Sequence, residues 1–353
     1  MDFKIGKVDF SGTKTIVIAE AGVNHLGRMD YAEELIKTAK RAGADIVKFQ
    51  TYKASKLVVK DAPRFWNWEG EVDKEGSQYD SYSRLDSFGE DEYRQLINLC
   101  KKYDIEFMST PFDEESAKML VDLGMKGFKV ASCDLTNIPF LRYLAKFNLP
   151  ILLSTGASNI SEIQEAIKSI ELEGCNRIGV MQCTLCYPTE TKDANLKAIS
   201  TLKSEFSGYP IGFSDHTLGT LIASASILLG VSYIEKHYTF DKTLPESADH
   251  WLSLDEAELN KLVSDLRTLE GAIGSGIKEK KECEDATHKF ARRSLVAARN
   301  ITKGTIISEE DLTAKRPGNG LAPIFKDRFV GLQALVDISE DEQITMDHAR
   351  KKI

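Results

Sequence analysis

Three of the six histidines in this chain directly follow hydrophobic runs with the composition of β-strands. These are His25, His216 and His237, and a helical pattern succeeds each of them. Strand, polar residues and helix in succession form the repeat of a β/α barrel, whose strands meet with their C-terminal ends at one mouth. Imidazoles at that mouth, with Glu20 and lysines on other strands, predict a metal site beside an anion site and therefore an enzyme.

His216 follows Ser214-Asp215, and His237 follows Glu235-Lys236, so two matched patterns end in a histidine. Each imidazole either caps its strand by hydrogen bonding or binds a divalent ion, and the repetition favours the metal. Two ligands leave positions open for water or substrate, as catalytic sites require. Mn²⁺ is expected, with Mg²⁺ or Co²⁺ as alternatives, and Asp215 or Glu235 would assist the histidines.

Two lysines, Lys48 and Lys129, lie within apolar strand runs. An inward ammonium there must meet a carboxylate or a bound anion, because burial of an unpaired charge is costly. Hydroxyls gather at strand ends, where they either cap the next helix or bind phosphate or carboxylate: Ser109, Thr110, Ser132, Ser154, Thr155 and Ser214. Glu20 ends the first strand and is either an ion-pair partner or a general acid/base.

The composition restricts the class of protein. The chain has 353 residues, 42% of them apolar and 28% charged, with a net charge of −8. This charge argues against general binding to nucleic acids or membrane surfaces. No signal region or membrane span is expected, so a cytoplasmic protein with reduced cysteines is predicted. The spacing of Cys183 and Cys186 also occurs in zinc and redox sites, but no second such pair accompanies it.

The order of elements predicts a (β/α)8 barrel with a small domain after it. Strands are expected near residues 15–20, 44–50, 105–109, 127–131, 150–154, 177–182, 210–213 and 232–236. No G-x-G-x-x-G follows the first strand, which disfavours dinucleotide binding. The irregular, aromatic segment 53–87 is typical of a lid or an interface. We expect domains at 1–276 and 291–353, joined by a charged linker at 277–290.

Several motifs follow one another in the order found in one enzyme family. They are Ile18–His25, Val47–Thr51, Ser109–Phe112, Asn137–Pro139, Ser154–Gly156, Phe213–His216, Ile234–His237 and Arg316–Gly320. The chain resembles the sialic acid synthase family, the nonulosonic acid synthases that include N-acetylneuraminate, legionaminate and pseudaminate synthases. The resemblance extends over nearly the whole chain. It implies a barrel followed by an antifreeze-like (SAF) domain, in a homodimer whose small domains cover each other's barrel mouths.

The resemblance also implies roles for individual residues. His216 and His237 would bind the metal, and phosphoenolpyruvate would bind to Lys48, Thr110, Lys129, Ser132, Ser154 and Ser214. Positions that contact the sugar or stabilise the transition state would be Glu20, Gln50, Tyr187 and Asp249. Asp134 would be a further catalytic carboxylate, and Arg316 would reach the partner's site. The implied reaction joins phosphoenolpyruvate to an open-chain N-acylated amino sugar and releases phosphate.

The chain departs from the neuraminate pattern at three places. Ser132-Cys133-Asp134 stands where Ser-Gly-Glu is common, Leu185 stands near an often polar position, and Glu246–Trp251 replaces a Gly-Pro-Asp-His version. Leu185 and Trp251 would suit a 2,4-diacetamido-6-deoxy hexose better than N-acetylmannosamine. A related synthase with another sugar is the alternative within enzymes.

An ice- or sugar-binding protein is the non-enzymatic alternative, because the small domain resembles antifreeze proteins. Ice binding requires a flat and rather apolar face. The domain instead contains many charged residues, among them Lys303, Lys315, Arg316, Lys326 and Arg328. The histidines and lysines of the barrel would also have no role in such a protein. Both points disfavour this alternative.

Overall fold

The computed structural model describes residues 3–12, 14–66, 75–244 and 249–350. The chain divides into two compact units, Met1–Gly274 and Ser275–Ile353. Each unit is described by itself. Trp68 of the aromatic segment and Glu246–Ala248 of the third departure lie outside the described residues.

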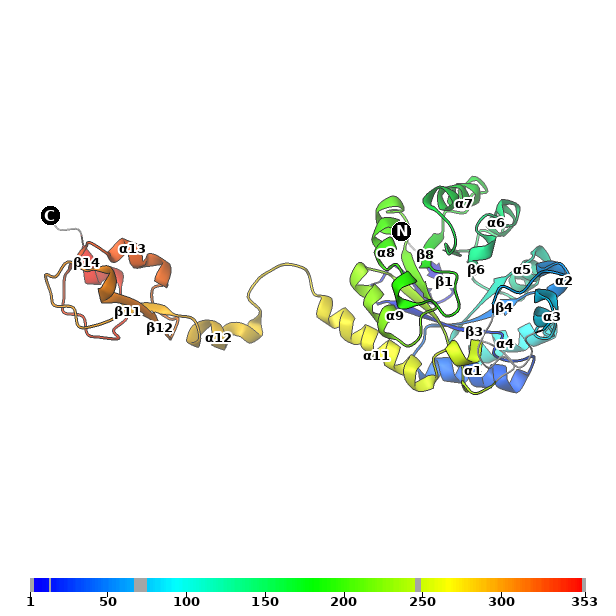
Figure 1. The fold of residues 1–353 in the computed structure, drawn as a ribbon, viewed down its shortest axis with the longest axis horizontal. Helices are drawn as coiled ribbons and strands as arrows, with labels where there is room; N and C mark the ends of the chain where they lie inside the picture. The colour runs from blue at the N-terminus through cyan, green and yellow to red at the C-terminus, as the bar shows by residue number, and fades with distance from the viewer. Residues whose placement is uncertain (1–2, 13, 67–74, 245–248, 351–353) are drawn as a thin grey trace. The chain divides into compact units, whose positions relative to one another are not determined.

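Eight parallel strands close into a barrel in the first unit (Figure 1). They are β3 (Ile16–Gly22), β4 (Ile46–Thr51), β5 (Glu106–Pro111), β6 (Phe128–Val130), β7 (Ile151–Ser154), β8 (Ile178–Cys183), β9 (Ile211–Asp215) and β10 (Tyr233–His237). The ring closes where β10 pairs with β3. The strands are almost wholly buried, as parallel strands covered by helices must be. The predicted barrel is therefore confirmed, and the strands begin one or two residues later than expected.

Helices surround the strands (Figure 1). The main ones are α1 (Met29–Arg41), α4 (Glu90–Lys102), α5 (Glu114–Asp122), α6 (Ile138–Ala145), α7 (Ile160–Leu172), α8 (Lys197–Glu205), α9 (Leu221–Ser226) and α11 (Glu256–Ile273). Shorter helices follow β4 and β10, namely α2 (Ala54–Leu57), α3 (Gln78–Ser83) and α10 (Asp249–Leu252). Asp113, Asn159 and Asp255 accept hydrogen bonds from the first turns of α5, α7 and α11. These caps fix where each helix starts.

An antiparallel hairpin, β1 (Lys4–Ile5) and β2 (Val8–Asp9), precedes the barrel. Its apolar side chains join an inner cluster made of Phe3, Ile5, Val8, Phe10, Ile16, Ile18, Ile46, Met108, Leu152, Met181 and Tyr233. Ile16, Ile46 and Tyr233 are the first residues of their strands. The hairpin therefore seals the N-terminal end of the barrel. The sequence analysis did not predict it.

The second unit contains two short antiparallel pairs of strands. β11 (Ser294–Ala297) pairs with β12 (Leu312–Lys315), and β13 (Gln333–Ala334) pairs with β14 (Ala349–Arg350). A small apolar core holds them together, and helix α13 (Lys326–Phe329) contributes Phe329 to it. The preceding residues 274–290 are exposed, and α12 (Asp285–Phe290) forms within the segment expected to be a linker.

The length and hydropathy of the helices bear on membrane insertion. In the part of the chain that the structure describes, none of the helices has both the length and the apolar character needed to cross a bilayer.

Candidate active site

A cavity of about 1,360 Å³ opens at the C-terminal ends of the barrel strands. Most of the predicted site residues line it: Glu20, Lys48, Gln50, Thr110, Lys129, Ser132, Asp134, Ser154, Tyr187, His216, His237 and Asp249. Ser214 does not line the cavity but contacts a residue that does, Glu235. Arg316 belongs to the second unit, where its side chain is exposed. The barrel thus brings all but one of the predicted residues together.

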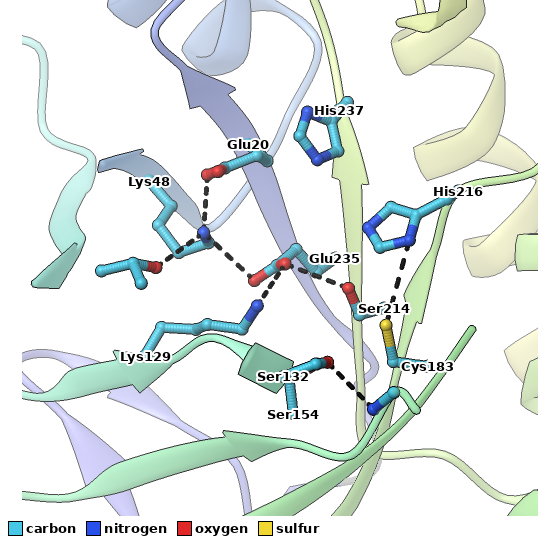
Figure 2. Close-up of polar contacts among 12 residues, drawn as sticks. Glu20, Lys48, Lys129, Ser132, Ser154, Cys183, Ser214, His216, Glu235 and His237 are labelled. Carbon is cyan, nitrogen blue, oxygen red and sulfur yellow. Dashed lines mark hydrogen bonds and ion pairs between the residues drawn. The ribbon is translucent and has the colours of Figure 1, made fainter. Parts of the chain in front are cut away.

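Two buried lysines and two buried glutamates form one network on the cavity wall (Figure 2). Lys48 Nζ lies 2.8 Å from Glu20 Oε2 and 3.6 Å from Glu235 Oε2, and it donates to Thr110 Oγ1 over 3.1 Å. Lys129 Nζ donates to Glu235 Oε1 over 3.1 Å. Each ammonium therefore has a carboxylate partner, as burial requires. Because the network lines the cavity, the lysines also face the space where an anion would bind.

Glu235 lies at the centre of this network, although the sequence analysis gave it only an assisting role. Its Oε1 also accepts a hydrogen bond of 3.1 Å from Ser214 Oγ. Burial alone would raise the pKa of Glu235, but Lys129 and Lys48 outweigh it and lower that pKa to about 2. Strand alternation could have predicted that Glu235 faces the cavity, because Glu235 and His237 are two residues apart on one strand and therefore share its inner face.

Glu20 and Gln50 are held together on neighbouring strands. Gln50 Nε2 donates to Glu20 Oε1 over 2.9 Å, while Glu20 Oε2 contacts Lys48. Both carboxylate oxygens of Glu20 are therefore engaged. The side chain is fixed at the end of β3, next to the cavity.

A cluster of two hydroxyls and a backbone amide lies on the side of Lys129 that faces away from Glu20 and Lys48 (Figure 2). Ser132 Oγ donates to Ser154 Oγ over 3.0 Å and accepts from Gly156 N over 2.9 Å. A Cβ at position 156 would come within 2.8 Å of Ser132 Oγ, so only glycine permits this approach. Hydroxyls next to a lysine form a suitable environment for phosphate or carboxylate oxygens.

The rings of His216 and His237 lie side by side, with centroids 5.5 Å apart. His216 Nδ1 is 2.9 Å from the Thr184 carbonyl oxygen, which can only accept, so Nδ1 carries a proton and a metal would bind the neutral ring through Nε2. Cys183 Sγ is 3.9 Å from the same Nδ1, and the ring of Tyr187 is 4.1 Å from that of His216.

The histidine pair fits a divalent ion. His237 Nδ1 is buried and has no hydrogen-bond partner among the described residues, and its contact with Asp249 Oδ2 is 3.4 Å long. Within the same residues, no three His, Cys, Asp or Glu side chains cluster as ligands. An ion bound here would take two imidazoles and complete its coordination with water or substrate.

Two further carboxylates line the cavity. Asp134 lies in a single 3₁₀ turn, Ser132–Asp134, where it accepts a hydrogen bond of 3.1 Å from Asn137 Nδ2. Burial raises its pKa. Burial also opposes ionisation of Asp249, but the neighbouring His237 outweighs it, so the pKa of Asp249 lies below its usual range.

The two cysteines with C-x-x-C spacing have different surroundings. Cys183 is buried at the end of β8 beside His216, whereas Cys186 is exposed, and both are free thiols. Burial would raise the pKa of Cys183, but His216 outweighs it and lowers that pKa to about 6.

The departures from the neuraminate pattern lie at different distances from the cavity. Leu185 lines it, whereas Trp251 is not part of the wall that the described residues form. Trp251 follows Asp249 by two positions on α10, which turns its side chain by about 200° from that of Asp249. The expectation that its ring faces the sugar is therefore not met.

Aromatic side chains form one wall of the cavity, and the segment predicted at 53–87 supplies most of them. Tyr52, Phe65, Trp66, Tyr82 and Phe112 line it. The centroid of the Tyr52 ring is 5.5 Å from that of Tyr82 and 6.0 Å from that of Phe112. We name these five residues the aromatic wall. The sequence analysis noted the aromatics but did not place them in the site.

Comparison with known proteins gives a consistent result. The model of the NeuB family matches residues 35–278, and that of the SAF domain matches residues 292–350. The chain is 39% identical to the N,N'-diacetyllegionaminic acid synthase of Legionella pneumophila over 342 residues, 96% of this chain and 95% of that protein. It is 40% identical to the synthase of the same name from Campylobacter jejuni over 333 residues, 94% of this chain and 99% of that protein.

Solved structures agree with the sequence comparisons. The N-acetylneuraminic acid synthetase of Leptospira borgpetersenii serovar Hardjo-bovis matches with a TM-score of 0.71 and 33% identity. The match covers 81% of this chain and 95% of that one.

Proposed function

The chain is a synthase that belongs to the NeuB family and carries a C-terminal SAF domain, and we propose that it condenses phosphoenolpyruvate with the open-chain form of an N-acylated amino sugar. One observation carries this proposal. Two buried lysines, from strands β4 and β6, and two histidines, one directly after β9 and one at the end of β10, line a single cavity together with two glutamates. This arrangement supports the binding of an anion beside a divalent ion, as the two proposed reactants require.

We assign phosphoenolpyruvate to the lysine side of the cavity. Lys48 and Lys129 would contact its charged groups, and the hydroxyls of Thr110, Ser132 and Ser154 would complete the site, while Ser214 would act through its hydrogen bond to Glu235. The two lysines and two glutamates sum to zero charge, so the network alone does not neutralise a substrate with a phosphate and a carboxylate. A divalent ion at the histidines and the partner subunit's Arg316 would supply the missing positive charge.

The chemistry follows from these positions. C3 of phosphoenolpyruvate attacks the aldehyde carbon of the sugar, the aldehyde oxygen takes up a proton, and positive charge develops at C2. Glu20 and Glu235 would stabilise that charge, and Lys48 and Lys129 would hold the phosphate oxygens. Water then adds to C2, and the resulting tetrahedral intermediate expels phosphate to leave a 2-keto acid. A divalent ion, Mn²⁺ before Mg²⁺ or Co²⁺, would polarise the aldehyde.

For the sugar, we propose a 2,4-diacetamido-6-deoxy hexose, with N-acetylmannosamine as the alternative. Two relatives that are 39% and 40% identical are named N,N'-diacetyllegionaminic acid synthases. Leu185 and the aromatic wall give the cavity an apolar side that suits a second acetamido group and a methyl group. Gln50, Tyr187 and Asp249 would contact the polar groups of the sugar. We place the enzyme in the cytoplasm, which six free cysteines support.

We also propose a homodimer in which each SAF domain covers the partner's barrel and presents Arg316 to the sugar's acyl group. Mixing Arg316→Ala subunits with His237→Ala subunits tests this. Exchanged domains give the heterodimer one complete site, built from the intact barrel of one chain and the intact arginine of the other, so activity returns. If each domain covers its own barrel, both sites stay defective and the mixture remains inactive.

A screen of amino sugars tests the function itself. The purified full-length enzyme is incubated with phosphoenolpyruvate, Mn²⁺ and each sugar, and phosphate release and product mass are measured. We expect phosphate and a nine-carbon keto acid in equal amounts, with the 6-deoxy diacetamido sugar preferred. A preference for N-acetylmannosamine would overturn the assignment of the sugar. Absence of product with every acylated amino sugar would overturn the function.

A further inference from the structure

Strands β9 and β10 carry a charged pair on the face that points away from the cavity. Ser214, His216, Glu235 and His237 occupy the inner face, so alternation turns Asp215 and Lys236 outward. Their sequence neighbours on the outer face, Phe213, Ile234 and Tyr238, belong to the apolar layer between strands and helices. Asp215 and Lys236 are only 1% and 2% exposed within that layer.

The pair is bonded to the backbone of Thr217, the residue that follows His216. Lys236 Nζ lies 2.7 Å from Asp215 Oδ2 and also donates to the Thr217 carbonyl oxygen. Asp215 accepts from Thr217 N over 2.9 Å and from Thr217 Oγ1 over 3.0 Å. We name Asp215, Thr217 and Lys236 the outer clamp.

The outer clamp connects the two strand ends that carry the histidines. Lys236 stands opposite Asp215 in the parallel register of β10 and β9. His216 lies between two clamped residues, and His237 directly follows the third. A shift of either strand end would therefore stretch the contacts of Lys236 with Asp215 and Thr217.

A buried ion pair is not the most stabilising choice for an apolar layer, because well-packed hydrophobic residues of similar volume often serve stability as well or better. The pair does supply directional contacts that fix the geometry of a strand end. Other charges near Lys236 are Glu258 and Lys242, which pair with each other. The contacts of Lys236 with Asp215 and Thr217 are therefore direct polar links between these two strand ends on the outer face.

We infer that the outer clamp is a positioning device that holds the imidazoles of His216 and His237 at the spacing at which they bind one divalent ion. The inference rests on the proposed function in that it takes the two histidines as the metal ligands. Groups that orient metal ligands typically affect metal affinity by about 10- to 100-fold when they are replaced. The clamp acts through the backbone, so the lower part of this range is expected.

Direct Mn²⁺ binding to the full-length enzyme, measured from the electron paramagnetic resonance signal of the free ion, tests the inference without any turnover. Asp215→Asn keeps the shape of the clamp but removes its negative charge, and Lys236→Met removes its cation. The matched control is Tyr238→Phe, which deletes a buried hydrogen bond of 2.8 Å to the Leu35 carbonyl on the other side of His237. Melting temperatures are recorded for all three variants.

We expect Asp215→Asn to weaken Mn²⁺ binding about tenfold and Lys236→Met to weaken it further, whereas Tyr238→Phe leaves it within about twofold. The value of kcat at fixed Mn²⁺ should fall more in the clamp variants than in Tyr238→Phe. If Lys236→Met does not fold, the Mn²⁺ affinity of Asp215→Asn alone tests the inference.

Clamp variants that melt at lower temperature but bind Mn²⁺ as the wild type does would overturn the inference and leave a purely structural ion pair. A wild-type enzyme that binds no divalent ion would overturn it as well. Failure of the proposed synthase reaction looks different. The wild type would then bind Mn²⁺ and the clamp variants would bind it more weakly, but no amino sugar would yield product.

Discussion

The two ends of the barrel are built from opposite materials. At the N-terminal end, the hairpin β1–β2 packs aromatic and aliphatic side chains into the barrel, and the ring of Phe10 lies 5.2 Å from those of both Phe3 and Tyr233. At the C-terminal end, lysines, glutamates and histidines surround a cavity. One end is a packed core, and the other is a cavity lined by buried charged side chains.

Individual strands change from apolar to charged side chains within a few residues. The inner face of β10 runs from Tyr233 through Glu235 to His237, and β4 runs from Ile46 through Lys48 on the same face. Each strand begins in the inner apolar cluster at the N-terminal end of the barrel, which we name the apolar plug, and ends at the cavity. The apolar end therefore stabilises the positions of the charged groups at the other end, where unpaired burial would be costly. Changes at the two ends should consequently have different effects.

The largest effect is expected at the mouth, from His237→Ala. Loss of one of two proposed metal ligands should reduce metal-dependent turnover about 10³-fold or more, because Lewis-acid polarisation contributes several kcal/mol. The circular dichroism spectrum should stay unchanged, since the side chain is not part of the apolar core. Turnover that persists at the wild-type level in EDTA would remove the metal from the mechanism.

At the opposite end, Phe10→Ala should destabilise the protein by about 3 kcal/mol, since it opens a cavity in the apolar plug. Denaturant-induced unfolding of the wild type and the variant measures the difference in their free energies of unfolding. The Michaelis constants of the folded fraction should remain those of the wild type. A large change in KM without loss of stability would show that the two ends are not separable in this way.

Lys129→Met at the mouth should weaken phosphoenolpyruvate binding by about one to two decades, which corresponds to roughly 1.5–3 kcal/mol for a charge-assisted contact. Sugar binding should change far less. Lys146→Met, at an exposed position after α6, is the control and should have no effect. Unchanged affinity for phosphoenolpyruvate in Lys129→Met would assign Lys129 to a structural ion pair with Glu235.

The smallest effect concerns the carboxyl of Asp134 and its pH dependence. Burial raises the pKa of Asp134, so ionisation is less favourable in the folded state than in the unfolded chain. This cost is absent at low pH, where both states are protonated, and grows as the pH rises past the normal carboxyl range. Asp134→Asn should therefore melt slightly higher than the wild type at neutral pH, with the difference vanishing near about pH 3. A difference that is independent of pH would contradict this explanation.

Much of the mouth was predictable from the sequence because strand alternation and the ends of apolar runs place side chains such as Lys48 and His216 by simple geometry. The central position of Glu235 on β10 depends on its contacts with side chains from three other strands, β4, β6 and β9, and the residue pattern of β10 alone does not reveal these contacts. The hairpin was missed because strands of two residues have no measurable period. Trp251 was misplaced because its orientation depends on the start of a short helix, where a shift of one residue turns a side chain by about 100°.

The fate of the oxygen that bridges C2 and phosphorus in phosphoenolpyruvate tests the central claim most directly. Substrate labelled with ¹⁸O at that atom is converted by the wild-type enzyme with the preferred sugar and Mn²⁺, and both products are analysed by mass spectrometry. Attack of water at C2 followed by expulsion of phosphate breaks the bond between carbon and oxygen, so the label should appear in the inorganic phosphate. Label retained in the keto acid would mean that the bond to phosphorus breaks, and this would contradict the proposed roles of the carboxylates and lysines at the barrel mouth.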